Sequence, residues 1–134
     1  MIRVLFVCLG NSCRSQMAEG FARAMGAGVW EVESAGLMPA TIIAPPVREV
    51  MEEKKIDLGD QFPKPVEWMR SQTFDLVVNM CGYPLPEAIA GPVREWRVED
   101  PIGRSGKVYR RVRDQIEELV RELFEEMRAR PVGD

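Results

Sequence analysis

Residues 4–23 contain the feature that most constrains the fold of this chain, because a strand-like run, a short loop and a helix follow one another without a break. Residues 4–7 are all apolar and include two valines and a phenylalanine, which predicts a strand buried on both faces of a parallel sheet. From Gln16 onward, apolar side chains recur at helical spacing. The loop between these two elements, residues 8–15, begins with Cys8 and ends with an Arg-Ser pair.

This loop has the properties of a binding site for a tetrahedral anion. A loop that leads into a helix N-terminus turns several backbone N–H groups inward, and the helix dipole adds partial positive charge at the same place. Gly10 and Asn11 suit a left-handed turn of the backbone, and the planar guanidinium of Arg14 can hold two oxygens of the anion at once. The predicted oxyanion-binding residues are Leu9, Gly10, Asn11, Ser12, Cys13, Arg14 and Ser15.

Cys8 lies where a nucleophile would attack the bound anion. The positive field that favours the anion also favours a thiolate over a thiol. A thiolate beneath an oxyanion is a nucleophile directed at the central atom of that anion. Ser15, beside Arg14, could hydrogen-bond either the thiolate or a leaving group. The loop therefore predicts nucleophilic chemistry on an oxyanion, with Cys8 and Arg14 as the central residues.

The composition narrows the classes of protein that this chain can represent. It has 134 residues, three cysteines, no histidine and a formal net charge of −3. The absence of histidine excludes Cys-His and Ser-His hydrolases, and three widely spaced cysteines do not match a zinc site, so we expect no metal. A net negative charge argues against binding to nucleic acid.

The length and the hydropathy pattern predict a single domain, residues 1–134, that does not interact with a membrane. No segment approaches the roughly 20 consecutive apolar residues that a membrane-spanning helix needs. The N-terminus opens directly into the first strand, without a charged leader and an apolar segment. We therefore expect a cytoplasmic protein.

Four predicted strands alternate with helices along the chain. The strands are expected at residues 4–7, 29–34, 75–80 and 94–98, the helices at 16 to about 26, 46–55 and 106–128, and a short helical turn at 67–71. This alternation predicts an α/β fold with three layers, α/β/α, around a four-stranded parallel sheet. Ligands bind beyond the carboxyl ends of such strands, and three of the strand ends deliver Cys8, Cys81 and Asp100.

The spacing Cys8-x5-Arg14-Ser15, directly after a first strand and at the start of a helix, resembles the phosphate loop of the low molecular weight protein tyrosine phosphatase superfamily. Residues 11–19, Asn-Ser-Cys-Arg-Ser-Gln-Met-Ala-Glu, are more similar to the arsenate reductases of that superfamily. The resemblance implies a low molecular weight phosphatase-like fold. It also implies that Asp100, in an Asp-Pro pair, is the general acid that protonates the leaving oxygen, although an aspartate there could equally cap a turn.

Cys81 distinguishes two functions within that superfamily. Arsenate reductases that resemble this chain carry a cysteine after the corresponding strand, and the tyrosine phosphatases usually do not. The resemblance therefore implies an arsenate reductase with no bound cofactor, in which Cys81 attacks Cys8, releases arsenite and leaves a Cys8–Cys81 disulfide. Thioredoxin, glutaredoxin or a low-molecular-weight thiol would then reduce this disulfide.

Two other functions remain open from the sequence. If Cys81 only closes a buried strand, the protein is a tyrosine phosphatase or a small phosphate monoesterase. Against this, Ile102-Gly103 follows Asp100 where such phosphatases usually carry aromatic residues that stack on phosphotyrosine. A catalytically silent oxyanion-binding module is the second alternative.

The chain also departs from the reductases that it resembles. Residues 82–91 contain no further cysteine, so the outer thiol pair of the thioredoxin-coupled enzymes is not available in its usual form. Either a partner reduces the disulfide directly, or Cys13, which we expect to be a packing residue of the loop, takes the missing role. Some relatives bind potassium through a segment that is replaced here by Phe62-Pro63-Lys64, and the charge of Lys64 predicts that no potassium site is present.

Overall fold

A four-stranded sheet with the order β2-β1-β3-β4 forms the centre of the molecule, and all of its strands run parallel. The computed structural model describes residues 1–129. The strands are β1 (Ile2–Cys8), β2 (Trp30–Gly36), β3 (Leu76–Asn79) and β4 (Val93–Glu95). The predicted four-stranded parallel sheet is confirmed, and residues 130–134 of the predicted domain lie outside the described residues.

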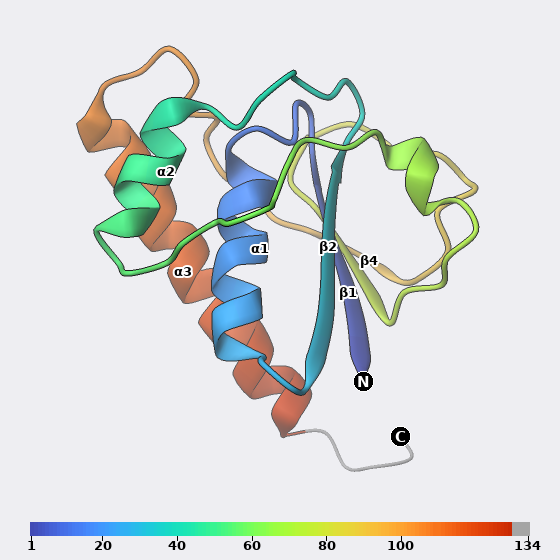
Figure 1. Cartoon of the computed structure of the whole chain (residues 1–134). Coiled ribbons are helices and arrows are strands. Elements are labelled where there is room, and N and C mark those ends of the chain that lie inside the picture. Colours follow the sequence, from blue (N-terminus) through green and yellow to red (C-terminus); the bar gives the residue numbers. More distant parts are fainter. Residues whose placement is uncertain (130–134) are drawn as a thin grey trace.

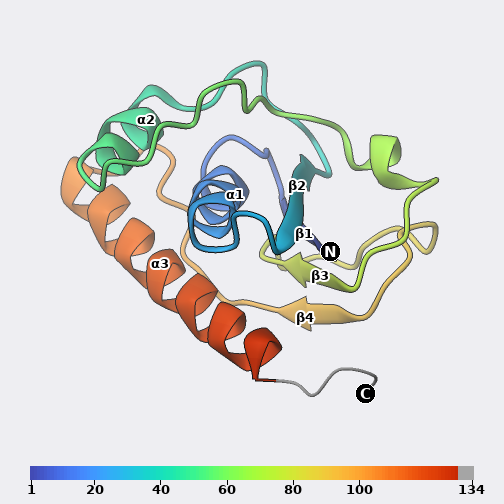
Figure 2. The same cartoon turned by 60° about the horizontal axis from the view of Figure 1, so that its bottom comes forward.

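Three α-helices cover one face of the sheet, and one short helix lies against the other face (Figure 1). They are α1 (Arg14–Met25), α2 (Pro45–Glu52) and α3 (Gly106–Arg128), with the 3-10 helix η1 (Val66–Met69) opposite them. Figure 2 shows α1 between the sheet and the long α3. The third of the predicted layers is thus η1 with its neighbouring loops.

The boundaries of α3 and β1 show how far an apolar pattern determines the length of an element. α3 begins and ends at the predicted residues, since its apolar stripe is regular over its whole length. β1 is longer than the predicted 4–7, because every residue from Ile2 to Cys8 pairs with β2. No helix within the described part of the chain is both long enough and apolar enough to cross a membrane.

β4 is shorter than the predicted strand at 94–98. Its pairing with β3 ends where Asn79 lies opposite Glu95. The next residue, Trp96, still donates its N–H to the carbonyl oxygen of Asn79 at 3.0 Å, and its ring packs on Phe6 with 5.8 Å between ring centroids. The chain therefore leaves the sheet immediately after β4, and residues 97–100 turn toward the end of β1.

The apolar run in β1 supplies both cores of the protein. The side chains of Val4 and Phe6 pack in the core under the α-helices, whereas those of Leu5 and Val7 pack on the face that carries η1. All four are completely buried. Each contributes roughly 1.5–3 kcal/mol through the burial of apolar surface. A central strand between two cores has no polar face, which explains the continuous apolar sequence.

Gly36 allows the end of β2 to lie directly against the loop that follows β1. A Cβ atom at this position would be 2.8 Å from the carbonyl oxygen of Leu9 and 3.0 Å from the backbone nitrogen of Asn11. Both of these atoms belong to backbone that cannot turn aside as a flexible side chain would. Glycine is therefore required here for close approach of two backbone segments.

We predict that Gly36→Ala lowers the free energy of unfolding by about 1–3 kcal/mol, because the added methyl group overpacks this contact. Urea-induced unfolding followed by circular dichroism measures the change. Gly106→Ala is the matched control, since its added Cβ would meet no atom closer than 3.6 Å. Equal stability of Gly36→Ala and the wild type would contradict this account of the loop.

Candidate active site

The loop between β1 and α1 is held in shape by the segment that follows β2. The carbonyl oxygens of Leu9, Gly10 and Ser12 accept hydrogen bonds from the N–H groups of residues 38, 40 and 44, at 2.8, 2.9 and 3.1 Å. In a trans peptide the next N–H points the opposite way from the carbonyl. The N–H groups that follow these three carbonyls therefore point away from the 38–44 segment, as an anion site requires.

Asn11, rather than Gly10, is the residue of this loop that adopts the left-handed conformation, with φ of 50°. Its side chain is completely buried and makes three hydrogen bonds. Nδ2 donates to the hydroxyl oxygens of Ser15 at 2.6 Å and Ser34 at 3.0 Å, and Oδ1 accepts from the N–H of Lys64 at 2.8 Å. These bonds hold Asn11 in an unfavourable backbone conformation, so that the loop is pre-organised.

A chain of hydrogen bonds leads through Asn11 to the sulfur of Cys8. Ser34 donates to the buried carboxylate of Glu19 at 2.6 Å, so its oxygen accepts from Asn11. The hydroxyl oxygen of Ser15 also accepts from Asn11 and lies 2.9 Å from Cys8 Sγ. The hydroxyl proton of Ser15 is therefore free to donate to a thiolate at Cys8, which is one of the two roles considered for this serine.

Arg14 brings the ends of three strands together. It is the first residue of α1, so the helix begins two residues earlier than predicted. Its guanidinium is buried, and Nη1 donates to the carbonyl oxygens of Met80 at 2.7 Å and Val98 at 3.1 Å. Nη2 lies 3.7 Å from Oδ2 of Asp100. One edge of the guanidinium is thus fixed by backbone, and the other faces a carboxylate.

Asp100 caps a turn and also faces the guanidinium of Arg14. Its Oδ1 accepts the N–H of Ile102 at 3.1 Å, which is the turn-capping role. Its Oδ2 faces Arg14, and 47% of its side chain is exposed to solvent. A carboxyl group in this position has access both to an anion bound by Arg14 and to bulk water.

Cys81 lies beside the same guanidinium. A cavity of about 620 Å³ is lined by Arg14, Cys81, Gly82, Trp96 and neighbouring residues of the segment after β4. The Cys81 thiol is buried, and this burial raises its pKa, with the nearby Cys8 and Glu95 acting in the same direction. All three cysteines are free.

The sequence analysis missed the residues that contact Cys81. Asn79 accepts from Cys81 Sγ at 2.8 Å, and the N–H of Tyr83 donates to the same sulfur at 3.4 Å. Glu95 in turn accepts from Asn79 at 3.2 Å. The available signal was a polar residue at the end of an otherwise apolar buried strand, two positions before a candidate cysteine.

Cys13 is buried at the N-terminus of α1, in the loop where the sequence predicted a packing residue. It precedes α1, is buried, and lies beside the side chain of Tyr109 on α3. Burial raises the pKa of the Cys13 thiol to about 12 and, for the same reason, that of the Tyr109 phenol to about 12. Both groups therefore stay protonated and neutral near pH 7.

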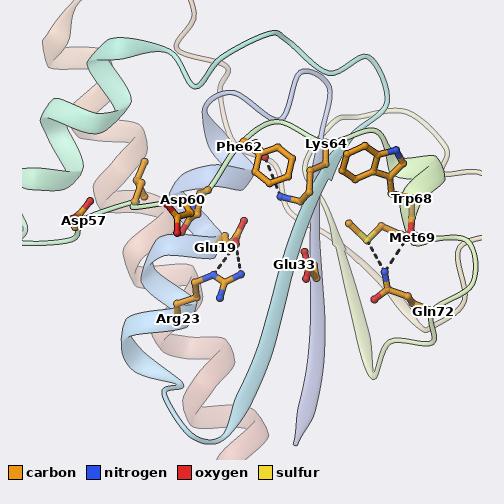
Figure 3. A pocket seen from close by; sticks show the side chains of 12 residues that line it. Glu19, Arg23, Glu33, Asp57, Asp60, Phe62, Lys64, Trp68, Met69 and Gln72 are labelled. Atoms are coloured by element: carbon orange, nitrogen blue, oxygen red, sulfur yellow. Dashed lines mark hydrogen bonds and ion pairs between the residues drawn. The ribbon is translucent and has the colours of Figure 1, made fainter.

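A second cavity, of about 610 Å³, lies on the outer side of α1 and β2 (Figure 3). The ammonium of Lys64 lies over the ring of Phe62, 4.7 Å from its centroid, and donates to the Phe62 carbonyl oxygen at 3.0 Å. The buried carboxylate of Glu19, which also lines this cavity, is paired with Arg23 at 2.6 Å. Within residues 1–129, no three acidic or cysteine side chains are grouped as metal ligands would be.

The chain belongs to the low molecular weight phosphotyrosine protein phosphatase family, whose model matches residues 3–132. Within this family it is similar to the "Glutaredoxin arsenate reductase" of Synechocystis sp., with 42% identity over 128 residues that cover 92% of this chain and 97% of that protein. The family and fold predicted from the sequence are thereby confirmed.

Two solved structures show the same relationship. "An arsenate reductase in the phosphate binding state" has a TM-score of 0.84 and 41% identity, and the match covers 94% of this chain and 98% of that one. A low molecular weight protein tyrosine phosphatase from T. tengcongensis has a TM-score of 0.79 and 31% identity, with 94% and 99% covered.

We predict that the free energy of unfolding falls as the pH rises above about 9. The pKa of Cys13 is 9.0 in an unfolded chain but about 12 in the fold, because the buried site favours the neutral thiol. Its contribution to the free energy of unfolding is therefore complete below pH 9 and is lost between pH 9 and 12. Urea unfolding at about pH 8 and about pH 10.5 measures this loss. Cys13→Ser, which cannot ionise in this range, should show a smaller fall, and an equal fall in both proteins would contradict the prediction.

Proposed function

We propose that this protein is an arsenate reductase, which converts arsenate to arsenite through a Cys8 thiolate and a Cys8–Cys81 disulfide. The observation that carries this proposal is the position of a second thiol, Cys81, in the same cavity as the anion-binding guanidinium of Arg14. The name of the relative from Synechocystis sp. supports the same reaction. A hydrolase that uses only Cys8 has no need of a thiol at this place.

The first step forms a bond between sulfur and arsenic. The loop N–H groups and Nη2 of Arg14 hold arsenate above Cys8, and Ser15 stabilises the thiolate through its hydroxyl proton. The Cys8 sulfur attacks arsenic, and one oxygen leaves. Asp100, whose Oδ2 lies 3.7 Å from Arg14 Nη2, donates a proton to that oxygen so that it departs as water.

The second step carries the electrons. Cys81 loses its proton and attacks the Cys8 sulfur, so that an S–S bond forms and the S–As bond breaks. The electron pair of the broken bond stays on arsenic, which changes from As(V) to As(III) and departs as arsenite. The two cysteine sulfurs together lose the two electrons that arsenic gains, and the product is a Cys8–Cys81 disulfide.

The third step restores the thiols at the expense of an external reductant. Thiol–disulfide exchange with a dithiol protein or a low-molecular-weight thiol returns both cysteines to the reduced state. Glutaredoxin is our first candidate, because the relative from Synechocystis sp. carries that name. Thioredoxin and a low-molecular-weight thiol are the other candidates, and no bound cofactor is needed.

Phosphatase activity is the second candidate function, and one observation favours it. The low molecular weight protein tyrosine phosphatase from T. tengcongensis aligns over 94% of this chain. In this protein Ile102, with 51% of its surface exposed, follows the Asp-Pro pair, and it offers an aryl phosphate no aromatic ring for stacking. A small inorganic anion needs no such ring, so we favour arsenate as the substrate.

We predict that one equivalent of arsenate converts the fully reduced protein to a form with a Cys8–Cys81 disulfide and releases arsenite, whereas phosphate does not. Peptide mass mapping identifies the bridge. Cys81→Ser should lose arsenate turnover while keeping any hydrolysis of small phosphate esters, and Glu87→Gln, which changes an exposed charge in the loop after Cys81, is the control that keeps both. Arsenate turnover that survives Cys81→Ser would overturn the mechanism in favour of an external thiol.

Labelling of Cys8 separates both enzymes from a silent binding module. We expect iodoacetamide to alkylate Cys8 near neutral pH, and arsenate or phosphate to suppress this reaction by covering the sulfur. A Cys8 that remains unlabelled, or whose labelling ignores both anions, would favour the silent module.

We predict that Asp100→Asn lowers the rate of the first step by about 10²–10⁴-fold, because the amide cannot supply the proton. The substitution keeps the side-chain oxygen that caps Ile102, so the turn should persist. Rapid-quench measurement of arsenate consumption tests the rate, and an unchanged rate of Cys8 alkylation shows that the nucleophile is intact. A loss of less than about threefold would assign the proton to another donor.

A further inference from the structure

Asn79, the last residue of β3, is a buried polar side chain whose hydrogen-bonding capacity is fully used. Its Oδ1 accepts from the N–H of Cys81 at 3.0 Å and from the sulfur of Cys81 at 2.8 Å. Its Nδ2 donates to the carbonyl oxygen of Tyr83 at 2.8 Å and to Oε2 of Glu95 at 3.2 Å. An amide has two donor hydrogens and two acceptor lone pairs, so this environment leaves none of them idle.

The partners of Asn79 fix both the orientation of the amide and the protonation of the sulfur. The N–H of Cys81 can only donate, whereas the Tyr83 carbonyl and the Glu95 carboxylate can only accept. The amide oxygen must therefore face Cys81. The sulfur lies 2.8 Å from this oxygen and 3.3 Å from the carbonyl oxygen of Tyr83. Because both oxygens can only accept, the sulfur is the donor, Asn79 is its nearer acceptor, and Cys81 is held as a thiol.

Formation of the disulfide requires this arrangement to break. In the reduced protein, Cys8 Sγ lies 2.9 Å from the Ser15 hydroxyl, and Cys81 Sγ lies 2.8 Å from Asn79. Bonded sulfurs must approach to about 2.05 Å, and neither can keep a proton. Cys81 must therefore lose both its proton and the hydrogen bond that this proton makes to Asn79. Gly82 has a φ of 78°, and a Cβ atom added to it would meet no atom within 4 Å. This glycine gives the backbone freedom to turn at this point.

We propose that Asn79 is a positioning residue for the second chemical step: it holds Cys81 as a thiol and links the release of that thiol to the backbone of Tyr83, which bonds both Asn79 Nδ2 and the Cys81 sulfur. This inference rests on the proposed function, because it takes Cys81 as the thiol that attacks Cys8. In the step itself, the S–H bond of Cys81 breaks and its proton passes to water. The S–S bond then forms while the bond from Cys8 to arsenic breaks, and the electron pair remains on arsenic.

Several charged groups face Cys81, and they decide how substitutions at Asn79 act. Cys8 lies at the end of β1, Glu95 on β4 and Arg14 at the start of α1, while Arg97 and Glu99 line the same cavity from the segment after β4. Burial, Cys8 and Glu95 all raise the pKa of Cys81. A new negative charge at position 79 should also raise the pKa of Cys81, whereas removal of the Asn79 oxygen, which accepts from the thiol, should lower it.

Two variants of opposite effect test the proposal in the full, reduced chain. Asn79→Asp keeps the acceptor oxygen but adds a charge, so Cys81 should react with iodoacetamide only at higher pH than in the wild type. Asn79→Ala removes the acceptor, so the pH profile should shift lower and labelling near pH 7 should become about two- to tenfold faster. Peptide masses give the rates, and Cys8 labelling in the same samples reports that the site is folded.

A second measurement connects these shifts to the reaction. After one equivalent of arsenate, the Cys8–Cys81 disulfide should form faster in Asn79→Ala and more slowly in Asn79→Asp than in the wild type. Glu87→Gln is the matched control, because it changes an exposed charge in the loop after Cys81 and should leave both rates within about twofold. Should Asn79→Ala not fold, Asn79→Asp, which has nearly the same shape, still tests the proposal, because a pH profile of Cys81 labelling that does not move upward would overturn it.

The outcomes separate this inference from the proposed function. Labelling of Cys81 needs no arsenate, so it tests the contact with Asn79 directly. If the wild type forms no Cys8–Cys81 disulfide with arsenate, the proposed function fails and this inference fails with it. If the wild type forms the disulfide but both variants match it, or both pH profiles shift in the same direction, Asn79 has only a structural role.

Discussion

The buried guanidinium of Arg14 is the interaction on which the architecture of the site depends. A buried cation is costly unless polar groups surround it, and here the carbonyl oxygens of Met80 and Val98 bond one nitrogen at 2.7 and 3.1 Å. Within residues 1–129, the one carboxylate that lies within ion-pair distance of it is that of Asp100, which is half exposed and 3.7 Å away. The positive charge is thus held firmly but neutralised incompletely, which is the property that the proposed anion site requires.

The parts of the fold and site that could be predicted from sequence are those encoded by local pattern. The apolar run of β1 and the regular stripe of α3 determine two elements almost completely, because each packs against a partner along its whole length. Cys8 and Arg14 were predicted because a loop between a strand and a helix has a fixed relation to the helix dipole. Asp100 and Cys81 were predicted because strand ends meet at one edge of a parallel sheet.

The parts that could not be predicted depend on contacts between distant segments. That Asn11 and not Gly10 adopts the left-handed conformation is decided by hydrogen bonds to Ser34 and Lys64, which are far away in sequence. β4 ends early because the Trp96 ring packs onto Phe6, a contact that the pattern of apolar residues in 94–98 does not predict. Asn79 belongs to an apolar strand, and only the paired geometry of β3 and β4 places Glu95 within its reach.

The strand order β2-β1-β3-β4 has a further consequence for how this family can diversify. The chain leaves β1 toward one side and β3 toward the other, so a crevice opens between the ends of these two neighbouring strands. With Val7 opposite Asn79, Cys8 ends one wall of the crevice and Cys81 follows the other. Topology alone thus makes the position just past β3 a neighbour of the nucleophile. In the proposed mechanism, a single thiol placed there is enough to add two-electron chemistry to an anion site, with no change to the scaffold.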